Sequence, residues 1–255
     1  MRSELCERAI ESLGLEIELF GSASEAGRVL RLPGVIASVS PLTPDRSLFN
    51  SVSAVDAAAL EESIEKLAAI YAGAGVRAWT VWVPDDDRAS AGLLERRGHV
   101  LDASPRSMGL ELVDLRPPAQ TLPGDAELVE GELGQIGAIN DLAYGIDDRS
   151  WATAINQTPD LTLRTLVAVI GGEAVSSAIV LEGGDDACLT GVATVPEHRG
   201  KGLAAAIVAQ LLTESRERGI RAGTLQASAS GSPIYERLGF SDVGFIEMWE
   251  LRQPA

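Results

Sequence analysis

A glycine-rich segment with two basic residues is the part of this sequence best suited to chemistry. It lies in residues 195–205, after a run rich in β-branched side chains and directly before a stretch whose apolar spacing predicts a helix. The start of a helix presents unpaired N–H groups and partial positive charge, so it can hold a phosphate. Gly200 and Gly202 leave room for the anion because they carry no Cβ atom. Arg199 and Lys201 can add charge-assisted hydrogen bonds.

Two other interpretations of this segment fit its residues less well. A Walker A loop needs Ser or Thr after its lysine to reach Mg²⁺, but Lys201 is followed by Gly202. A dinucleotide-binding loop formally fits Gly200-x-Gly202-x-x-Ala205. However, four residues separate it from the preceding strand, and the next predicted strand ends in Leu225-Gln226, without a carboxylate for a ribose. A nucleotide-dependent enzyme is therefore the weakest alternative. A plain turn into a helix also fits less well, because it does not need two glycines beside two cations.

The segment resembles the acetyl-CoA loop of the GNAT N-acetyltransferase superfamily. Arg199-Gly200-Lys201-Gly202-Leu203-Ala204 fits the R/Q-x-x-G-x-G/A motif of that family, and Ser232-Pro233-Ile234-Tyr235-Glu236-Arg237-Leu238-Gly239-Phe240 is similar to its downstream tyrosine segment. The two motifs occur in the family's order, and the resemblance covers about residues 126–251. It implies a GNAT fold, acetyl-CoA as co-substrate, and direct acetyl transfer to a primary amine without a metal or a covalent intermediate.

The resemblance also implies roles for individual residues. The strand that ends at Val195 would be bulged and splayed from the strand at Thr224–Gln226, so that its backbone binds the pantetheine arm. Tyr235 would protonate the departing thiolate, for which a phenol that is neutral at pH 7 is suited. Many relatives carry a cofactor-contacting asparagine where this chain has Ser228, which weakens that assignment. The implied cofactor-binding residues are Ala193, Thr194, Val195, Arg199, Gly200, Lys201, Gly202, Leu203, Ala204 and Ser228.

The general base is not assigned by the sequence. An acceptor amine is mostly protonated at pH 7 and must lose a proton before it attacks a thioester. No Asp or Glu occurs in Leu189–Val195, where relatives often carry a base. A water chain to a distant carboxylate stays open, and so does a non-catalytic acyl-CoA-binding module. The other candidates, each also explained as a solvated loop or strand residue, are Glu197, Asp147, Asp148, Glu247 and Glu250.

The elements predicted around this segment form a mixed α/β unit. Alternating β-branched runs predict strands, and apolar residues at helical spacing predict helices. Gly171-Gly172 and residues 183–186 are typical of hairpin turns. The expected strands are Ala126–Val129, Leu163–Ile170, Ala174–Glu182, Ala187–Val195, Arg221–Gln226 and a final pair between Phe240 and Leu251. The expected helices are Leu133–Tyr144, Trp151–Ile155, one from about Leu203, and Pro233–Leu238.

The two halves of the chain resemble each other. Gly75–Val81 matches Gly219–Leu225 at an offset of 144, and Leu94–His99 matches the segment that starts at Tyr235 at an offset of 141. Each match follows a helical pattern that ends at a glycine suited to a left-handed stop, Gly73 or Gly75 and Gly219. Repeated order predicts two tandem GNAT-like domains, 1–118 and 119–255. The proline-rich segment 116–124 is the expected linker.

The first half lacks the residues of the acetyl-CoA loop. The position equivalent to Arg199 is Val55, in a segment without glycine or basic residues, and the position equivalent to Tyr235 is Leu94. We therefore expect a degenerate GNAT-like domain that is structural or forms a wall of the acceptor cleft. Trp79 and Trp82 alternate with valines in a strand pattern, which favours core packing over ligand contact.

Composition limits the partners. The 255 residues carry 37 acidic and 21 basic side chains, a net charge of −16, with only two lysines. This argues against nucleic acid as a partner and suits either a cationic acceptor or solubility alone.

No apolar run is long enough to span a bilayer, and the mixed-charge start predicts no leader peptide. Cys6 and Cys188 fit no metal or redox spacing and predict two buried thiols in the cytoplasm. With two histidines we expect no metal site, and a homodimer stays open.

Overall fold

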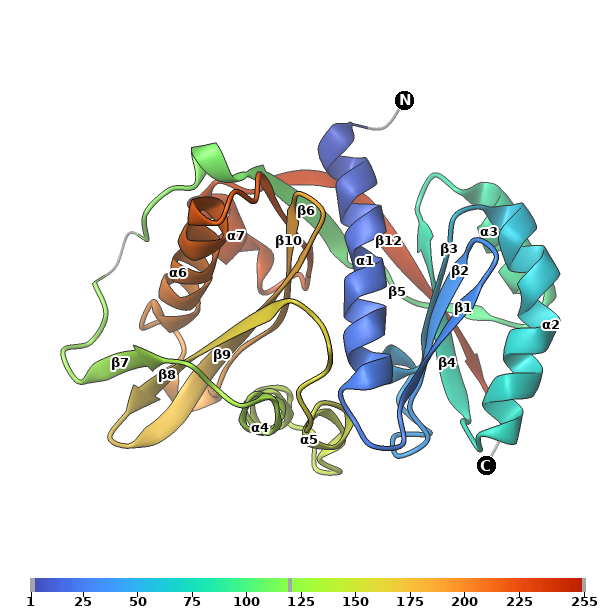
Figure 1. The fold of residues 1–255 in the computed structure, drawn as a ribbon, viewed down its shortest axis with the longest axis horizontal. Helices are drawn as coiled ribbons and strands as arrows, with labels where there is room; N and C mark the ends of the chain where they lie inside the picture. Colours follow the sequence, from blue (N-terminus) through green and yellow to red (C-terminus); the bar gives the residue numbers. More distant parts are fainter. Residues whose placement is uncertain (1–2, 119–120, 254–255) are drawn as a thin grey trace.

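A computed structural model describes residues 3–118 and 121–253 of the chain (Figure 1). The first half contains α1 (Glu4–Ser22), β1 (Arg28–Leu32), β2 (Val35–Val39), η1 (Ser47–Phe49), β3 (Ser51–Ala54), α2 (Ala57–Gly73), β4 (Ala78–Pro84), α3 (Arg88–Arg96), β5 (Val100–Ala103), β6 (Arg106–Glu111) and η2 (Leu112–Asp114). The second half contains β7 (Ala126–Val129), α4 (Leu133–Tyr144), α5 (Ser150–Ala154), β8 (Leu163–Ile170), β9 (Glu173–Gly183), β10 (Asp186–Thr194), η3 (Pro196–His198), α6 (Leu203–Glu217), β11 (Ala222–Ala227), α7 (Ser232–Leu238) and β12 (Ser241–Arg252).

The fold is mixed α/β, as the sequence predicts, and its strands form one continuous sheet. The order is β1-β2-β3-β4-β12-β6-β11-β10-β9-β8-β7, with β5 paired to β12. Most neighbours are antiparallel, but β3 pairs with β4 and β10 with β11 in parallel. Each parallel pair needs a crossover, which α2 supplies in the first half and α6 in the second. The expected elements between 126 and 238 are confirmed, with ends that differ by a residue at most.

The C-terminal segment is one long strand, so the predicted final strand pair is wrong. The first part of β12 pairs with β6, and Ile246–Arg252 pairs with β4. β6 comes from the first half yet lies between β11 and β12. Each half thus supplies a strand to the other half's part of the sheet. The sequence between Phe240 and Leu251 could not reveal this, because sequence alone does not show which edge a strand will meet.

The expected linker has no regular structure where it is described. Residues 115–118 and 121–125 form no helix or strand, and residues 119 and 120 lie outside the described residues. Pro117, Pro118 and Pro123 account for this, because proline has no N–H to donate to a ladder or a helix. Strand β6 precedes this segment in the chain and lies beside β11 and β12, which follow it, and β12 also lies beside β4. The sheet therefore joins the parts of the chain before and after the segment. The division into domains 1–118 and 119–255 stays a prediction.

The segments that match between the halves occupy corresponding elements. Gly75 and Gly219 both adopt positive φ, +72° and +97°, directly after α2 and α6. The chain then enters β4 in one half and β11 in the other. Leu94 lies on α3 and Tyr235 on α7, the next helix in each case. The matching segments therefore fall on elements that follow each other in the same order, and the internal repeat stays a prediction.

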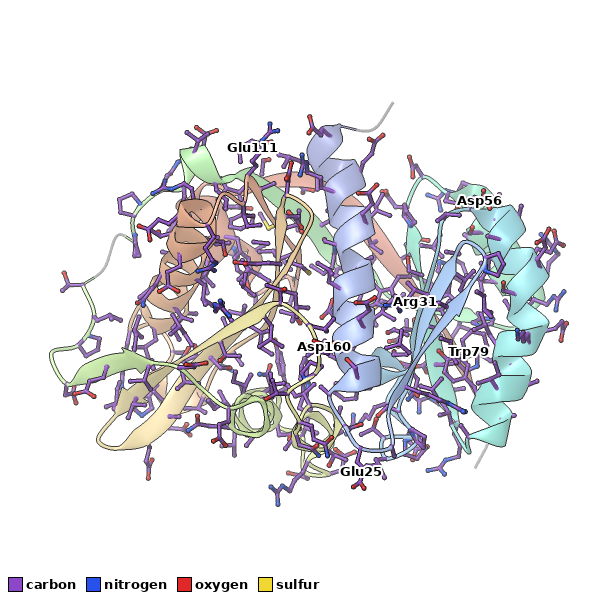
Figure 2. The ribbon with its side chains drawn as sticks, viewed as in Figure 1. Glu25, Arg31, Asp56, Trp79, Glu111 and Asp160 are labelled. Atoms are coloured by element: carbon purple, nitrogen blue, oxygen red, sulfur yellow. The ribbon has the colours of Figure 1, made fainter. Side chains whose placement is uncertain are left out.

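Helix α1 lies between the two halves and was not expected from the sequence (Figure 1). The Ser3 hydroxyl accepts from the Cys6 N–H at 3.2 Å, which caps the helix, and acidic residues in its first turn suit the helix dipole. Its buried face packs on strands of both halves. Arg31 of β1, labelled in Figure 2, forms an ion pair with Glu18 of this helix. α1 thus joins the halves as a shared layer.

The core of the first half confirms the packing expected of its tryptophans. Trp79, labelled in Figure 2, is buried. It stacks on Tyr71 with ring centroids 4.8 Å apart and makes a T-shaped contact with the His99 ring. Trp82 is also buried and donates from Nε1 to the Ser51 hydroxyl at 2.9 Å. Trp82 additionally lines the large cavity described below. Burial therefore accounts for both tryptophans, and one of them also faces a cavity.

The two cysteines differ in burial. Cys188 is buried in β10 beneath α1, whereas Cys6 is only partly buried, which corrects the expectation of two buried thiols. Within residues 3–118 and 121–253, no set of three or more His, Cys, Asp and Glu side chains is arranged to hold a metal ion. No helix in the described part of the chain is long and apolar enough to cross a membrane.

A buried carboxyl group lies where α1 covers the sheet. Thr224 Oγ1 donates to Asp186 Oδ2 at 2.5 Å, and the Thr224 hydroxyl lies 2.7 Å from the Ser12 hydroxyl of α1. Asp186 Oδ1 is buried and has no hydrogen-bond partner within the described residues. Burial raises the pKa of Asp186 to about 7 despite these contacts. The ionised form of Asp186 therefore costs folding free energy.

Replacing this carboxyl group should stabilise the protein at high pH. Asp186 titrates near 4 when unfolded and about 7 when folded, so its stabilising contribution is complete below pH 4 and is lost as pH rises toward 7. We expect Asp186→Asn to raise the free energy of unfolding at pH 8.5 by roughly 2–4 kcal/mol, with a much smaller gain near pH 4. Urea unfolding at both pH values measures this. The exposed neighbour Asp185→Asn is the matched control; an equal gain from it would contradict the prediction.

Candidate functional site

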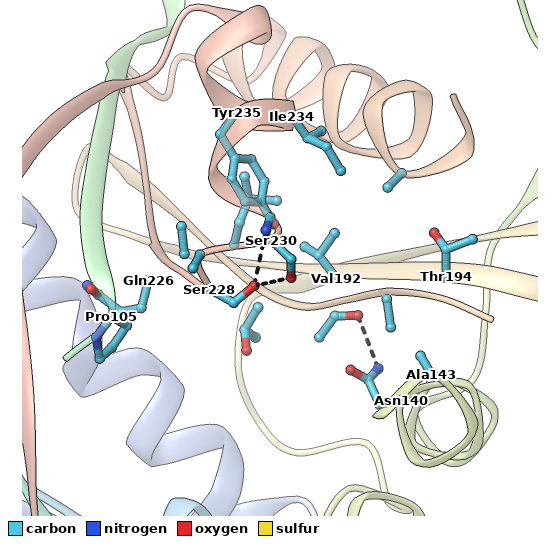
Figure 3. A pocket seen from close by; sticks show the side chains of 18 of the residues that line it. Pro105, Asn140, Ala143, Val192, Thr194, Gln226, Ser228, Ser230, Ile234 and Tyr235 are labelled. Atoms are coloured by element: carbon cyan, nitrogen blue, oxygen red, sulfur yellow. Dashed lines mark hydrogen bonds between the residues drawn. The ribbon is translucent and has the colours of Figure 1, made fainter. Parts of the chain in front are cut away.

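A large cavity opens between the two halves beside the carboxyl ends of β10 and β11. Its volume is about 1320 Å³, beyond the roughly 300–1,000 Å³ of sites for drug-sized ligands. Its walls come from α1, η1, β4 and β6 in the first half and from α4, β10, α6, β11 and α7 in the second. Figure 3 shows Tyr235 and Ile234 of α7 on one side, Asn140 and Ala143 of α4 on the other, and Val192 and Thr194 of β10 between them. The cavity has room for a long cofactor and a second substrate.

The splayed strands predicted from the resemblance are present. β10 pairs with β11 only from Asp186 to Leu189, and a register shift against β9 falls between Thr190 and Ala193. Gly191 stands in this bulge with φ +59°. Beyond Leu189, β10 keeps its ladder to β9 but has no paired neighbour on the β11 side within the described residues. That edge can accept an extended ligand by main-chain hydrogen bonds.

Polar side chains beneath the strand hold the bulge in place. Asn140 Nδ2 donates to the Gly191 carbonyl at 3.2 Å and to the Ile136 carbonyl at 2.9 Å. The Ser177 hydroxyl donates to the same Gly191 carbonyl at 3.0 Å. A carbonyl turned out of the ladder by the bulge is thus satisfied from α4 and β9. The free edge is consequently fixed before any ligand binds.

The glycine loop places its N–H groups at the same cavity. Gly200 and Gly202 adopt φ values of +76° and +79°, and Gly202 caps α6. No hydrogen-bond partner for the N–H groups of residues 200–205 is found in the described part of the chain. The Arg199 N–H is already used by the Pro196 carbonyl at 3.2 Å. The donors open to an anion therefore begin at Gly200.

The two basic side chains of the loop are placed differently. Arg199 Nη2 donates to the Ala143 carbonyl at 2.6 Å and its Nε to the Thr194 carbonyl at 3.1 Å. This guanidinium therefore ties the loop to the last turn of α4, where a cation suits the helix dipole. Lys201 Nζ lies 3.2 Å from His198 Nδ1, and Lys201 does not line the cavity, although Arg199 does. Arg199 therefore holds the loop against α4, a role that its position in the sequence motif did not reveal.

Tyr235 lies where the sequence motif implies. It is buried on α7, faces the cavity, and meets Phe240 edge to face at 5.8 Å (Figure 3). Burial, and secondarily the nearby Tyr144, raises the pKa of Tyr235 above its ordinary value. The phenol is therefore protonated at neutral pH and can only act as an acid there. Ser228 also lines the cavity, with its hydroxyl 3.2 Å from that of Ser230.

The implied cofactor residues divide into two groups. Val195 and Lys201 do not line the cavity. Those that do line it are Ala193, Thr194, Arg199, Gly200, Gly202, Leu203, Ala204 and Ser228. The structure thus brings most of the implied residues together around one space.

The carboxylates that the sequence left open as bases lie elsewhere. Asp148 forms an ion pair with Arg46 at 2.8 Å and accepts from the Ser150 N–H at the start of α5. Glu247 and Glu250 belong to β12, as expected, and accept from Trp249 and Arg252. Neither these residues nor the two that remain, Asp147 and Glu197, line the cavity.

A carboxylate from the first half lines the cavity instead. Glu16 of α1 accepts from the Thr190 hydroxyl at 2.5 Å, across 174 residues of sequence. Burial raises the pKa of Glu16 above its ordinary value. The only signal in the sequence is an acidic residue beside the apolar positions Leu13 and Ile17 of a capped helix, which does not distinguish a cavity wall from a surface. Sequence reasoning missed this residue.

A bulged strand splayed from its parallel neighbour, with a glycine loop and a helix start across the gap, defines the class of GNAT acetyltransferases. The sequence profile of the acetyltransferase (GNAT) domain matches residues 185–243. The match covers β10 through β12 and includes the loop and Tyr235. Residues 185–243 therefore match the GNAT acetyltransferase family, whose members transfer acyl groups from acyl-CoA.

Solved structures share the fold over the whole chain. A GCN5-related N-acetyltransferase from Kribbella flavida superposes with a TM-score of 0.68 at 18% identity, covering 99% of this chain and 96% of that one. One from Sphaerobacter thermophilus gives 0.58 at 16% identity, covering 96% and 94%. A tandem GNAT protein from the clavulanic acid biosynthesis pathway gives 0.56 at 13% identity, covering 98% and 96%. No curated protein matches the sequence.

Proposed function

We propose that this protein is an N-acetyltransferase that transfers the acetyl group of acetyl-CoA directly to a primary amine. The observation that carries the proposal is the meeting, at one cavity, of an unpaired strand edge, a row of unpartnered N–H groups and a protonated tyrosine. The strand edge suits the amides of a pantetheine arm, and the loop suits a pyrophosphate. Tyr235 supplies the proton that a departing thiolate takes up.

The residues present fit an acyl-CoA. A Cβ at Gly200 would meet no atom within 4 Å, so open space adjoins the loop. Among the described residues, the N–H groups of residues 200–205 have no acceptor, and an anion would supply one. Arg199 holds the loop against α4 without itself reaching for the ligand. Ser228 lies at the end of β11, where it can accept or donate one hydrogen bond to the bound arm.

The first half takes a different part in this proposal. Its helices and strands from β1 to α3 follow the same order as those from β8 to α7, but it carries no glycine loop before α2, and Leu94 stands where the second half has Tyr235. Residues of α1, β4 and β6 nevertheless line the shared cavity. We assign residues 119–255 to catalysis and residues 1–118 to a degenerate GNAT-like domain that walls the acceptor side. The charge of −16 suits a cationic acceptor and a soluble cytoplasmic protein.

Calorimetric titration with acetyl-CoA tests the first step of the proposal. We expect saturable binding, and no heat of binding at millimolar acetyl-CoA would overturn it. Thiol release against a panel of amines, with the amide product detected by mass spectrometry, then tests catalysis. Binding without thiol release from any amine would favour the alternative, a non-catalytic acyl-CoA-binding module.

A further inference from the structure

Two hydrogen-bond acceptors, Glu16 of α1 and Gln226 of β11, line the same cavity. Leu189 and Leu225 form the last pair of β10 with β11, and Thr190 and Gln226 directly follow it where the two strands separate. Both side chains lie on the face covered by α1, because Glu16 bonds to Thr190 and the next side chain on the Gln226 face, Thr224, bonds to Ser12. Gln226 Nε2 donates to the Ser107 hydroxyl at 3.3 Å, but its Oε1 is buried and has no partner in the described part of the chain.

These two acceptors match the donors of a primary ammonium group. An ammonium carries three N–H donors and one positive charge. The Glu16 carboxylate supplies the counter-charge, and the unpartnered Gln226 Oε1, which belongs to the wall of the same cavity, supplies a neutral acceptor. A buried carbonyl oxygen without a partner is costly, so a donor from a ligand would lower the free energy of the complex.

Apolar side chains surround this polar pair. Leu48 and Trp82 of the first half and Met248 of β12 line the cavity and belong to one apolar cluster with Leu13 and Ile17 of α1. Further apolar lining residues are Ala103, Pro105, Trp151, Leu189 and Phe245. Burial of an apolar ligand body against them is favourable by roughly 25 cal/mol per Å².

The charges that face the cavity leave Glu16 as its single anion. Among the described residues that line the cavity, Glu16 is the one carboxylate. Arg106 is held by Asp242 and Glu236, and Arg199 by two carbonyl groups. The other titratable lining residues are His198, Arg237, Tyr144 and Tyr235. A second cation on the ligand would meet no counter-charge here, and a carboxylate would lie beside Glu16.

We propose, building on the acetyltransferase function above, that the acceptor is a hydrophobic monoamine and that Glu16 binds its ammonium and takes its proton. The chemical class is a primary amine on an aromatic or branched aliphatic body without a second charge. Both halves therefore contribute residues to the acceptor site, the first half supplies the base, and the second half supplies the acyl donor site.

The proton and bond changes balance with two residues. The Glu16 carboxylate takes one proton from the ammonium, and the nitrogen lone pair forms the new C–N bond as the C–S bond of the thioester breaks. The Tyr235 hydroxyl gives its proton to the sulfur. The surplus proton left on the nitrogen returns through solvent to the Tyr235 oxygen, and Glu16 releases its proton to solvent. Cys188 also faces Glu16 from β10, and burial raises the pKa of its thiol, so it stays neutral.

Glu16→Gln tests the base. We expect kcat/KM for phenylethylamine to fall on the order of 10²- to 10⁴-fold, the usual contribution of a general base. The acid limb of the wild-type pH profile, which we assign to protonation of Glu16 at a pKa raised by burial, should disappear. Affinity for acetyl-CoA, measured by calorimetry, should not change. The matched control is Glu11→Gln, an exposed glutamate of the same helix, which should behave as wild type.

Matched amine pairs test the acceptor class. We expect kcat/KM for pentylamine to exceed that for 1,5-diaminopentane, and that for phenylethylamine to exceed that for phenylalanine, each by at least about tenfold. If wild type binds no acetyl-CoA, the acetyltransferase function fails. If wild type transfers acetyl groups but Glu16→Gln retains its rate, or charged acceptors are preferred, this proposal alone is overturned.

Discussion

Gly202→Glu should abolish acetyl-CoA binding. Gly202 caps α6 with φ +79°, and the N–H groups around it face the cavity without partners. A glutamate there places a carboxylate where the proposal puts a pyrophosphate, and like charges in contact cost several kcal/mol. We expect the Kd from calorimetry to rise by at least about 100-fold, which corresponds to about 2.7 kcal/mol.

Backbone strain alone must be separated from this electrostatic effect. Any side chain at positive φ costs roughly 1–2 kcal/mol of folding free energy. Gly172→Glu is the matched control: Gly172 has φ +86°, is exposed in the turn between β8 and β9, and has no atom within 4 Å of a Cβ. This variant carries the same strain and charge but should bind acetyl-CoA as wild type does. Equal affinities for the two variants would show that the loop does not hold the pyrophosphate.

Tyr235→Phe should mainly lower turnover. The change removes one hydroxyl and keeps the ring that packs on Phe240, so the fold and acetyl-CoA affinity should persist. Loss of the acid that protonates the thiolate should lower kcat on the order of 10²- to 10⁴-fold. Because burial raises the pKa of Tyr235, its ionisation should not limit the rate near neutral pH. Steady-state kinetics with thiol detection separate kcat from KM.

A second tyrosine provides the control. The Tyr71 hydroxyl donates to the Ser38 carbonyl at 2.9 Å in the core of the first half, and Tyr71 does not line the cavity. Tyr71→Phe should lower stability by about 1 kcal/mol through the lost hydrogen bond and leave kcat unchanged. A kcat for Tyr235→Phe within twofold of that control would remove Tyr235 from the mechanism.

Each half contributes a strand to the other half's part of the sheet, so the two halves depend on each other for their structure. β6 lies between β11 and β12, and β12 continues into the ladder with β4. Main-chain hydrogen bonds therefore cross between the halves in both directions, and α1 covers the junction. The cavity lies at this junction, so its two sides are held at a defined separation by the sheet itself.

The amino-acid sequence by itself determined the proposed acyl-donor side of the site. Its features are local: the loop glycines Gly200 and Gly202, the helix after them and the tyrosine segment. The conformation of each depends on residues within a short stretch of the chain. The elements between 126 and 238 followed from periodicity for the same reason. The loop and the bulge accordingly lie where the sequence implied.

The proposed acceptor side depends on the tertiary structure. Glu16 reaches the cavity only because α1 packs against β10, and the hydrogen bond that shows this joins residues 174 positions apart. Likewise, β12 forms one strand across both halves because β4 and β6 offer it edges that no local pattern encodes. Pairing partners far apart in sequence are chosen by burial and edge complementarity in the whole fold, so a single sequence does not display them.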